Sequence, residues 1–271
     1  MFYYVGEMSP TARPDPRNAG VACASQWRRI ADAVEQLPDQ VFDIVTRLPG
    51  WRLAELVEHL TMCAGALPFR LAEPAPSKVE IDLAHYLLAV PTAAAIISLR
   101  EQESARASEP ATQKLRLRAA VTDLEESLST VASDIDRVVP TRFGAIRVTD
   151  FIVTRCIEGV VHGFDLAAAV PVTDLVPEGA TLKIATRALL GALATKAPGR
   201  SVEVRVPPVA AIQCVEGPRH TRGTPPNVVE MNPVVWIELA TGRLAWKEAA
   251  DDGRLRASGD RSDISALFPL L

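Results

Sequence analysis

The sequence is poor in the features that mark several protein classes. Its four cysteines lie far apart and form no C-x-x-C pair, so neither a zinc ribbon nor a disulfide framework is indicated. It has no basic block and a net charge of −4, which argues against nucleic acid as a partner. No apolar run reaches the roughly 18–20 residues that span a bilayer. Because the start also lacks a signal-peptide pattern, we expect a cytoplasmic protein.

The composition is that of an ordinary globular protein, and the apolar residues recur with a strong helical period. It has 271 residues, of which 48% are hydrophobic and 23% charged, enough for two modest domains. Apolar residues recur at helical spacing over 22–48, with a break at Pro38, and again over 53–69. Further helices are expected over 82–105, kinked at Pro91, and over 111–136. A short hairpin with Gly144 at its tip follows, and then a helix that Thr149 or Asp150 would cap.

The pattern changes after about residue 178. One more helix is expected over 180–197, and two alternating strands over 201–206 and 209–215. Residues 217–233 are rich in Gly, Pro and Asn and predict a loop. Two short helices, a strand end at 254–259 and a last helix over 262–271 complete the chain. We therefore expect an α+β protein with a helical domain over 20–172 and a smaller α+β domain over 178–271.

The stretch TRCIEGVVHGFDLAAAV, residues 154–170, combines an apolar helix with a stripe of ionisable groups. Arg155, Glu158, His162 and Asp165 are spaced by three, four and three residues, which places them on one helix face. Glu158 and His162 are four apart, a normal spacing for two ligands of one metal ion. Imidazole and carboxylate ligands suit Zn²⁺, and also Ni²⁺, Fe²⁺ or Mn²⁺.

A third ligand must come from another helix, and His59 is the best candidate. It lies at the border of the apolar stripe of the helix expected over 53–69. Three protein ligands would leave one coordination position for water or substrate, as in catalytic sites. Asp165 could then accept the free ring N–H of His162, and Arg155 could orient Glu158 or face an anionic substrate.

A plainer interpretation also fits these residues. Glu/His pairs at this spacing are common on helices, and a histidine at a helix border is often a hydrogen-bonded core residue. An ion pair between Arg155 and Glu158 would satisfy the buried charges as well as a metal would.

Two motifs together resemble a known family. LPGWRLAELVEHL, followed about a hundred residues later by RCIEGVVHGFDLAAA, resembles the mycothiol-dependent maleylpyruvate isomerases. The N-terminal domains of that family are DinB-like metal-binding four-helix bundles. The resemblance implies that His59, Glu158 and His162 bind a divalent metal, usually zinc, and that mycothiol is the thiol partner. It covers roughly residues 20–170.

The tail resembles a second family, the bacterial orthologues of sterol carrier protein 2. The resemblance rests on HTRGTPPNVVE and the residues after it, and covers about 180–271. Such domains pack a few strands against helices and can enclose an apolar tunnel for lipids. In the loop itself, Arg222 and Asn227 could point at a cleft and bind a cofactor or substrate. They could equally tie the loop down through hydrogen bonds.

Three functions remain open at this stage. The first is a metal-dependent enzyme that activates a low-molecular-weight thiol for isomerisation or transfer on a small-molecule substrate. The second is a carrier of lipid or another apolar small molecule, based on the sterol-carrier-like tail. The third is a metal-binding module without catalytic activity. The open coordination position favours the first.

Overall fold

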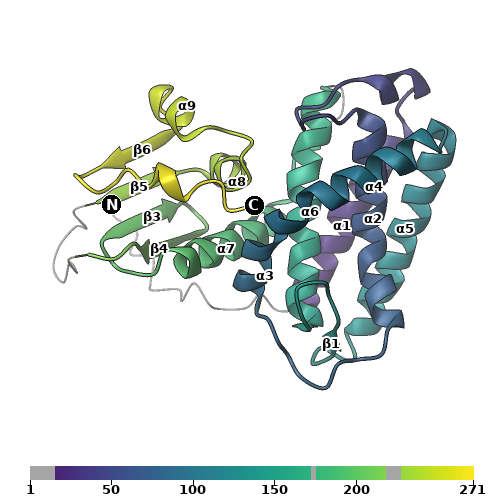
Figure 1. Cartoon of the computed structure of the whole chain (residues 1–271), viewed down its shortest axis with the longest axis horizontal. Helices are drawn as coiled ribbons and strands as arrows, with labels where there is room; N and C mark the ends of the chain where they lie inside the picture. Colours follow the sequence, from purple (N-terminus) through teal and green to yellow (C-terminus); the bar gives the residue numbers. More distant parts are fainter. Residues whose placement is uncertain (1–15, 172–174, 218–226) are drawn as a thin grey trace. The chain divides into compact units, whose positions relative to one another are not determined.

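The computed structural model describes residues 16–171, 175–217 and 227–271, shown in Figure 1. The chain separates into two compact units, and the division falls after Ala185, inside helix α7. The first unit is helical and the second combines a small sheet with helices. The α+β class with a helical N-terminal region is therefore confirmed.

The helical unit is built on four long helices. Helix α1 packs against α5 and α6, and α2 packs against the same two helices, so that the four enclose one core. The bounds are α1 Pro16–Glu35, α2 Leu53–Ala72, α5 Pro110–Val131 and α6 Val148–Ala169. The shorter elements are η1 Asp39–Asp43, α3 Leu83–Ala89, η2 Val90–Ala93, α4 Ala94–Arg106, β1 Val138–Val139 and β2 Ile146–Arg147.

Proline and glycine act where the sequence predicted. Helix α1 ends before Pro38, and the predicted kink at Pro91 is the 3₁₀ turn η2 between α3 and α4. Strands β1 and β2 pair antiparallel, with Gly144 in the connecting turn at a φ of 123°. The predicted cap of α6 is wrong. The helix begins at Val148, directly after β2, so Thr149 and Asp150 are already helical, and Asp150 is buried in the first turn.

The second unit contains a four-stranded sheet in the order β4-β3-β5-β6. The central strand β3 pairs antiparallel with β4 and parallel with β5, and β5 pairs antiparallel with β6. Trp236 is fully buried, and its ring nitrogen donates to the carbonyl of Thr186, which joins two helices of the unit. The elements are α7 Gly179–Lys196, β3 Val202–Val206, β4 Ala210–Cys214, β5 Val228–Met231, α8 Pro233–Ala240, α9 Trp246–Asp251 and β6 Leu255–Ser258.

Two sequence predictions for this unit are wrong. Residues 228–231 form strand β5 instead of continuing the loop, because their backbone pairs with β3 and β6. The expected last helix is a single 3₁₀ turn, η3 Ser265–Leu267. The helix does not continue because the backbone N–H groups of Leu270 and Leu271, after this turn, both donate to the carbonyl of Ala240. Phe268 packs between the rings of Trp236 and Trp246.

Among the described residues, no single helix is long and apolar enough to cross a bilayer. The bent pair Leu83–Ala93 and Ile96–Arg106 passes the length and composition test only when its two parts are joined.

Candidate metal centre

Helix α6 is buried along most of its length and carries the ionisable stripe. Close packing against α1 fixes its position, because Trp27 Nε1 donates to the carbonyl of Arg155 at 3.0 Å and Gln26 Nε2 donates to that of Gly159. A Cβ at Gly159 would lie 3.1 Å from Gln26 Cγ, so the glycine permits this approach. The stripe therefore faces α2 on a rigid support.

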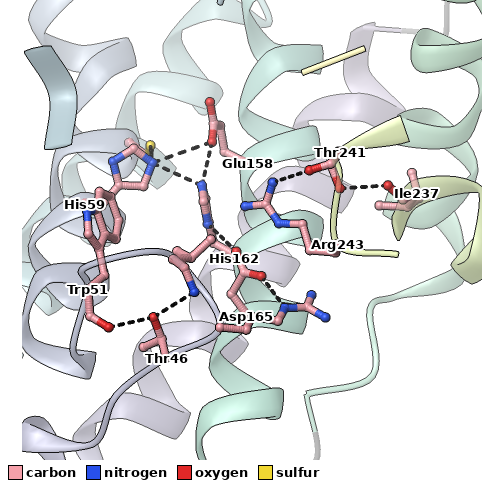
Figure 2. Close-up of polar contacts among 12 residues, drawn as sticks. Thr46, Trp51, His59, Glu158, His162, Asp165, Ile237, Thr241 and Arg243 are labelled. Atoms are coloured by element: carbon pink, nitrogen blue, oxygen red, sulfur yellow. Dashed lines mark hydrogen bonds and ion pairs between the residues drawn. The ribbon is translucent and has the colours of Figure 1, made fainter. Parts of the chain in front are cut away.

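Helices α2 and α6 bring three donor atoms to one point. His59 Nε2 lies 3.0 Å from His162 Nε2, and His162 Nε2 lies 3.1 Å from Glu158 Oε2. The third separation, between His59 Nε2 and Glu158 Oε2, is 3.8 Å. Figure 2 shows both rings and the carboxylate directed at the same point. The expected approach of His59 to the Glu158–His162 pair is thus observed.

A buried carboxylate contacts the His162 ring at the nitrogen that does not face the cluster. Asp165 is fully buried, and its Oδ2 lies 2.9 Å from His162 Nδ1. Its other oxygen, Oδ1, accepts a hydrogen bond from Arg47 Nε at 2.6 Å. Because Asp165 Oδ2 accepts the hydrogen bond from Nδ1–H, a neutral His162 ring carries its lone pair on Nε2, which faces Glu158. The predicted role of Asp165 behind His162 agrees with this geometry.

Arg155 supports the cluster from the other side. Its Nη2 lies 3.7 Å from Glu158 Oε1, and its Nη1 donates to the carbonyl of Cys63 at 3.1 Å. The guanidinium also lies 4.9 Å from the centre of the Phe151 ring. Burial disfavours its charge, yet Cys63 and Glu158 nearby raise the pKa of Arg155 above its ordinary value. Arg155 is therefore a fixed positive charge beside the Glu158 carboxylate.

The Glu158 carboxylate is kept ionised by its neighbours. Burial alone would raise its pKa, but hydrogen bonds from His162 and His59 and the charge of Arg155 hold the pKa well below its usual value. Those hydrogen bonds need a proton on Nε2 of each ring. With lone pairs on both Nε2 atoms instead, the two nitrogens and the ionised carboxylate would repel one another unless a cation lay between them. Either extra protons or a metal ion meets that need.

The distances fit a divalent ion. Nitrogen and oxygen ligands bind zinc at about 2.0–2.1 Å, so two ligands of a tetrahedral ion are about 3.3–3.4 Å apart. The three observed separations, 3.0, 3.1 and 3.8 Å, lie on either side of that value. The donor set of two imidazoles and a carboxylate is chemically suited to zinc and to neighbouring first-row metals.

A cavity of about 170 Å³ adjoins this cluster within the helical unit. His59, Glu158 and Arg155 line one side of it. Tyr86 from α3 and Arg142 from the β1–β2 turn line it elsewhere. Burial raises the pKa of Tyr86, so its phenol stays protonated and is available as a hydrogen-bond donor. Neither Tyr86 nor Arg142 lies in a motif with the metal-ligand candidates, so the sequence did not point to them.

Two further candidates belong to the loop before β5. Arg222 lies outside the described residues. Asn227 is buried, and its side chain donates to the carbonyl of Ser201 at 2.8 Å and accepts from the backbone N–H of Arg261 at 3.0 Å. These bonds join the start of β5 to neighbouring segments, which is the structural alternative considered for this loop.

Fold and site together define a class: a helical domain with a His/Glu/His cluster on two of its long helices, followed by a small α+β unit. The chain belongs to the mycothiol maleylpyruvate isomerase N-terminal domain family, whose model matches residues 23–167. Residues 178–270 match the family of bacterial SCP orthologues. Both resemblances seen in the sequence are thereby confirmed.

Solved structures agree at the level of the fold. A crystal structure of the mycothiol-dependent maleylpyruvate isomerase is similar at 15% identity and a TM-score of 0.58, covering 85% of this chain and 90% of that one. A mutant of that enzyme with a histidine replaced by alanine is similar at 14% identity and a TM-score of 0.61, covering 90% and 93%. A search of curated proteins found no match.

Proposed function

We propose that this protein binds one divalent metal ion, most favourably Zn²⁺, through His59, Glu158 and His162. We further propose that it catalyses a thiol-dependent isomerisation or transfer on a small electrophilic substrate, with mycothiol as the thiol. The observation that carries the proposal is the convergence of two buried imidazoles and the half-buried Glu158 carboxylate from α2 and α6, with 3.0 Å between the two imidazole nitrogens. Membership of the family supports the choice of thiol.

The surroundings of the cluster suit such chemistry. A bound divalent ion would supply a Lewis acid that lowers the pKa of a coordinated thiol or water. Arg155 holds Glu158 in place, and Asp165 fixes the ring of His162 so that Nε2 faces the cluster. The adjoining cavity gives a substrate a place beside the donors, within the same unit.

The cavity wall favours an anionic substrate. Arg142 lines it in addition to Arg155 and to Arg70, which is paired with Glu73, and no acidic side chain other than Glu158 does so among the described lining residues. Arg142 is exposed at the β1–β2 turn, where its guanidinium can meet an incoming carboxylate. The protonated phenol of Tyr86 can donate a hydrogen bond to an oxygen on which negative charge develops.

A direct test is a thiol-dependence assay. The metal-loaded protein is incubated with mycothiol and with maleylpyruvate or other anionic electrophiles, and product formation is followed by chromatography. We expect turnover that requires both thiol and metal, is lost in His162→Ala and is retained in His85→Ala, whose side chain is exposed and bonded to Asp82. Turnover that persists without thiol, or in the His162→Ala protein, would refute the proposal.

The match to bacterial SCP orthologues supports one alternative, a carrier of lipid or another apolar small molecule in the second unit. This function requires ligand binding that survives loss of the metal cluster. Binding of a fluorescent fatty acid with equal affinity to the wild-type and His59→Ala proteins, together with no thiol-dependent turnover, would favour the carrier. A protein that binds metal but shows neither property would be a non-catalytic metal-binding module. Location in the cytoplasm stays a prediction.

A further inference from the structure

Cys63 lies one helical turn after His59 on α2 and faces the same cluster. Its side chain is buried, and its Sγ lies 3.4 Å from His59 Nε2. His59 Nε2, Cys63 Sγ and a Glu158 carboxylate oxygen all lie within 4.8 Å of one another. Cys63 therefore adds a sulfur donor beside two of the three proposed ligands, His59 and Glu158.

The spacing is that of a ligand. Zinc binds thiolate sulfur at about 2.3 Å and imidazole nitrogen at about 2.0–2.1 Å, which puts the two atoms about 3.5 Å apart in a tetrahedral site. The observed separation of Sγ from His59 Nε2 is 3.4 Å. We propose that Cys63 is a fourth ligand, and that the resting site holds its metal through His59, Cys63, Glu158 and His162. This inference rests on the metal site proposed above.

Charge distinguishes this role from an ordinary buried thiol bonded to a histidine. A divalent ion beside Arg155 would bring three positive charges into a site where Glu158 supplies one negative charge, since Asp165 is paired with Arg47. A Cys63 thiolate supplies a second negative charge and reduces the uncompensated charge that burial makes costly. When the sulfur binds, its S–H bond breaks, the proton goes to solvent water and a sulfur–metal bond forms.

Ligation by Cys63 changes how a thiol substrate reaches the metal. Three protein ligands leave a tetrahedral ion one open position, whereas four fill it. An incoming thiol would then replace the Cys63 thiolate, sulfur for sulfur, and the proton from its S–H group would pass to Cys63. Cys63 lines the adjoining cavity together with His59 and Glu158, so a thiol that entered the cavity would lie beside its sulfur.

Cobalt(II) is the probe that separates the possibilities, because a thiolate ligand adds a sulfur-to-metal charge-transfer band in the near ultraviolet. Full-length metal-free protein is titrated with Co²⁺ as wild type, as Cys63→Ser and as Cys156→Ser. The control thiol, Cys156, is buried on α6, where its Sγ bonds the carbonyl of Ala19. We expect the band in the wild type and in Cys156→Ser, and its loss in Cys63→Ser while the visible d–d bands of bound cobalt remain.

The other possible results of the cobalt titration would each refute one or both metal-site proposals. Two outcomes would overturn ligation by Cys63 and leave the three-ligand metal site intact. One is a wild-type protein with visible d–d bands but no charge-transfer band. The other is a Cys63→Ser protein whose charge-transfer band is unchanged. No cobalt binding by a folded wild-type protein would overturn both proposals. Should Cys63→Ser fail to fold, Cys63→Ala replaces it, and iodoacetamide labelling of the wild type gives a second readout. Zinc must then slow alkylation of Cys63 at least tenfold, and equal rates with and without zinc would refute the role.

Discussion

Replacing Asp165 by asparagine isolates the support behind His162. Asp165 is fully buried, with Oδ2 2.9 Å from His162 Nδ1 and Oδ1 bonded to Arg47 Nε at 2.6 Å. An amide has nearly the same shape and can still accept one hydrogen bond, but it carries no charge. The substitution therefore removes the negative charge that makes His162 a better ligand, while the ring keeps its place.

The expected magnitude follows from the contact between Asp165 and His162, the proposed ligand. Loss of such a partner weakens metal affinity by about 10- to 100-fold, or about 1.4–2.8 kcal/mol. The assay is competition for Zn²⁺ against a chromophoric chelator at fixed pH, with circular dichroism to confirm folding. The matched control is Asp82→Asn, which alters an exposed carboxylate bonded to His85 Nδ1 at 2.8 Å and should leave the affinity unchanged. A folded Asp165→Asn protein with wild-type affinity would refute the reasoning.

Three further predictions concern the free energy of unfolding, measured by urea denaturation of the metal-free protein. Leu60→Ala empties a fully buried position on α2 and should cost about 2–5 kcal/mol, whereas Leu115→Ala, at a position 72% exposed, should change stability by less than about 0.5 kcal/mol; equal effects would contradict the burial. Gly65→Ala should stabilise by about 0.5–1 kcal/mol, because a Cβ there meets nothing within 4 Å. Gly159→Ala should destabilise the protein instead, through the close contact with Gln26. A gain in stability would contradict this and show that helix α1 can shift to make room for the added methyl group. Burial raises the pKa of Cys214 to about 11, above an unfolded value of about 8.5, so unfolding releases a proton and stability falls as the pH rises through this window. Cys214→Ala should show a shallower decline, and an identical pH profile would contradict the assignment.

The sequence predicted the helical unit well because its apolar residues follow a helical period and its prolines stand at the breaks. It also predicted that Glu158 and His162 lie together, because a spacing of four residues has a direct geometric meaning on a helix. The position of His59 could not be predicted from helical spacing alone, since its approach to this pair depends on the packing of α2 against α6. The family motif supplied what periodicity alone could not.

The sequence-based predictions fail where contacts between distant residues determine the local structure. Strand β5 consists of a few residues after a proline-rich loop, and only pairing with β3 and β6 makes it a strand. The last segment resembles a helix in composition, but its backbone bonds to Ala240 instead. Arg47 lies 118 residues before its partner Asp165, and nothing local in the sequence signals that contact. For Cys63 a signal was present, namely its spacing of four residues after His59.

The central claim, a metal bound by His59, Glu158 and His162, is tested most directly by metal analysis. Divalent metal is measured by mass spectrometry in freshly purified wild-type protein, in His162→Ala and in His85→Ala, a histidine exposed on α3. The account predicts about one equivalent of metal in the wild type and in His85→Ala, and loss of that metal in His162→Ala. Absence of metal from a folded wild-type protein, even after incubation with excess zinc and a mild reductant, would contradict it, as would full retention in His162→Ala.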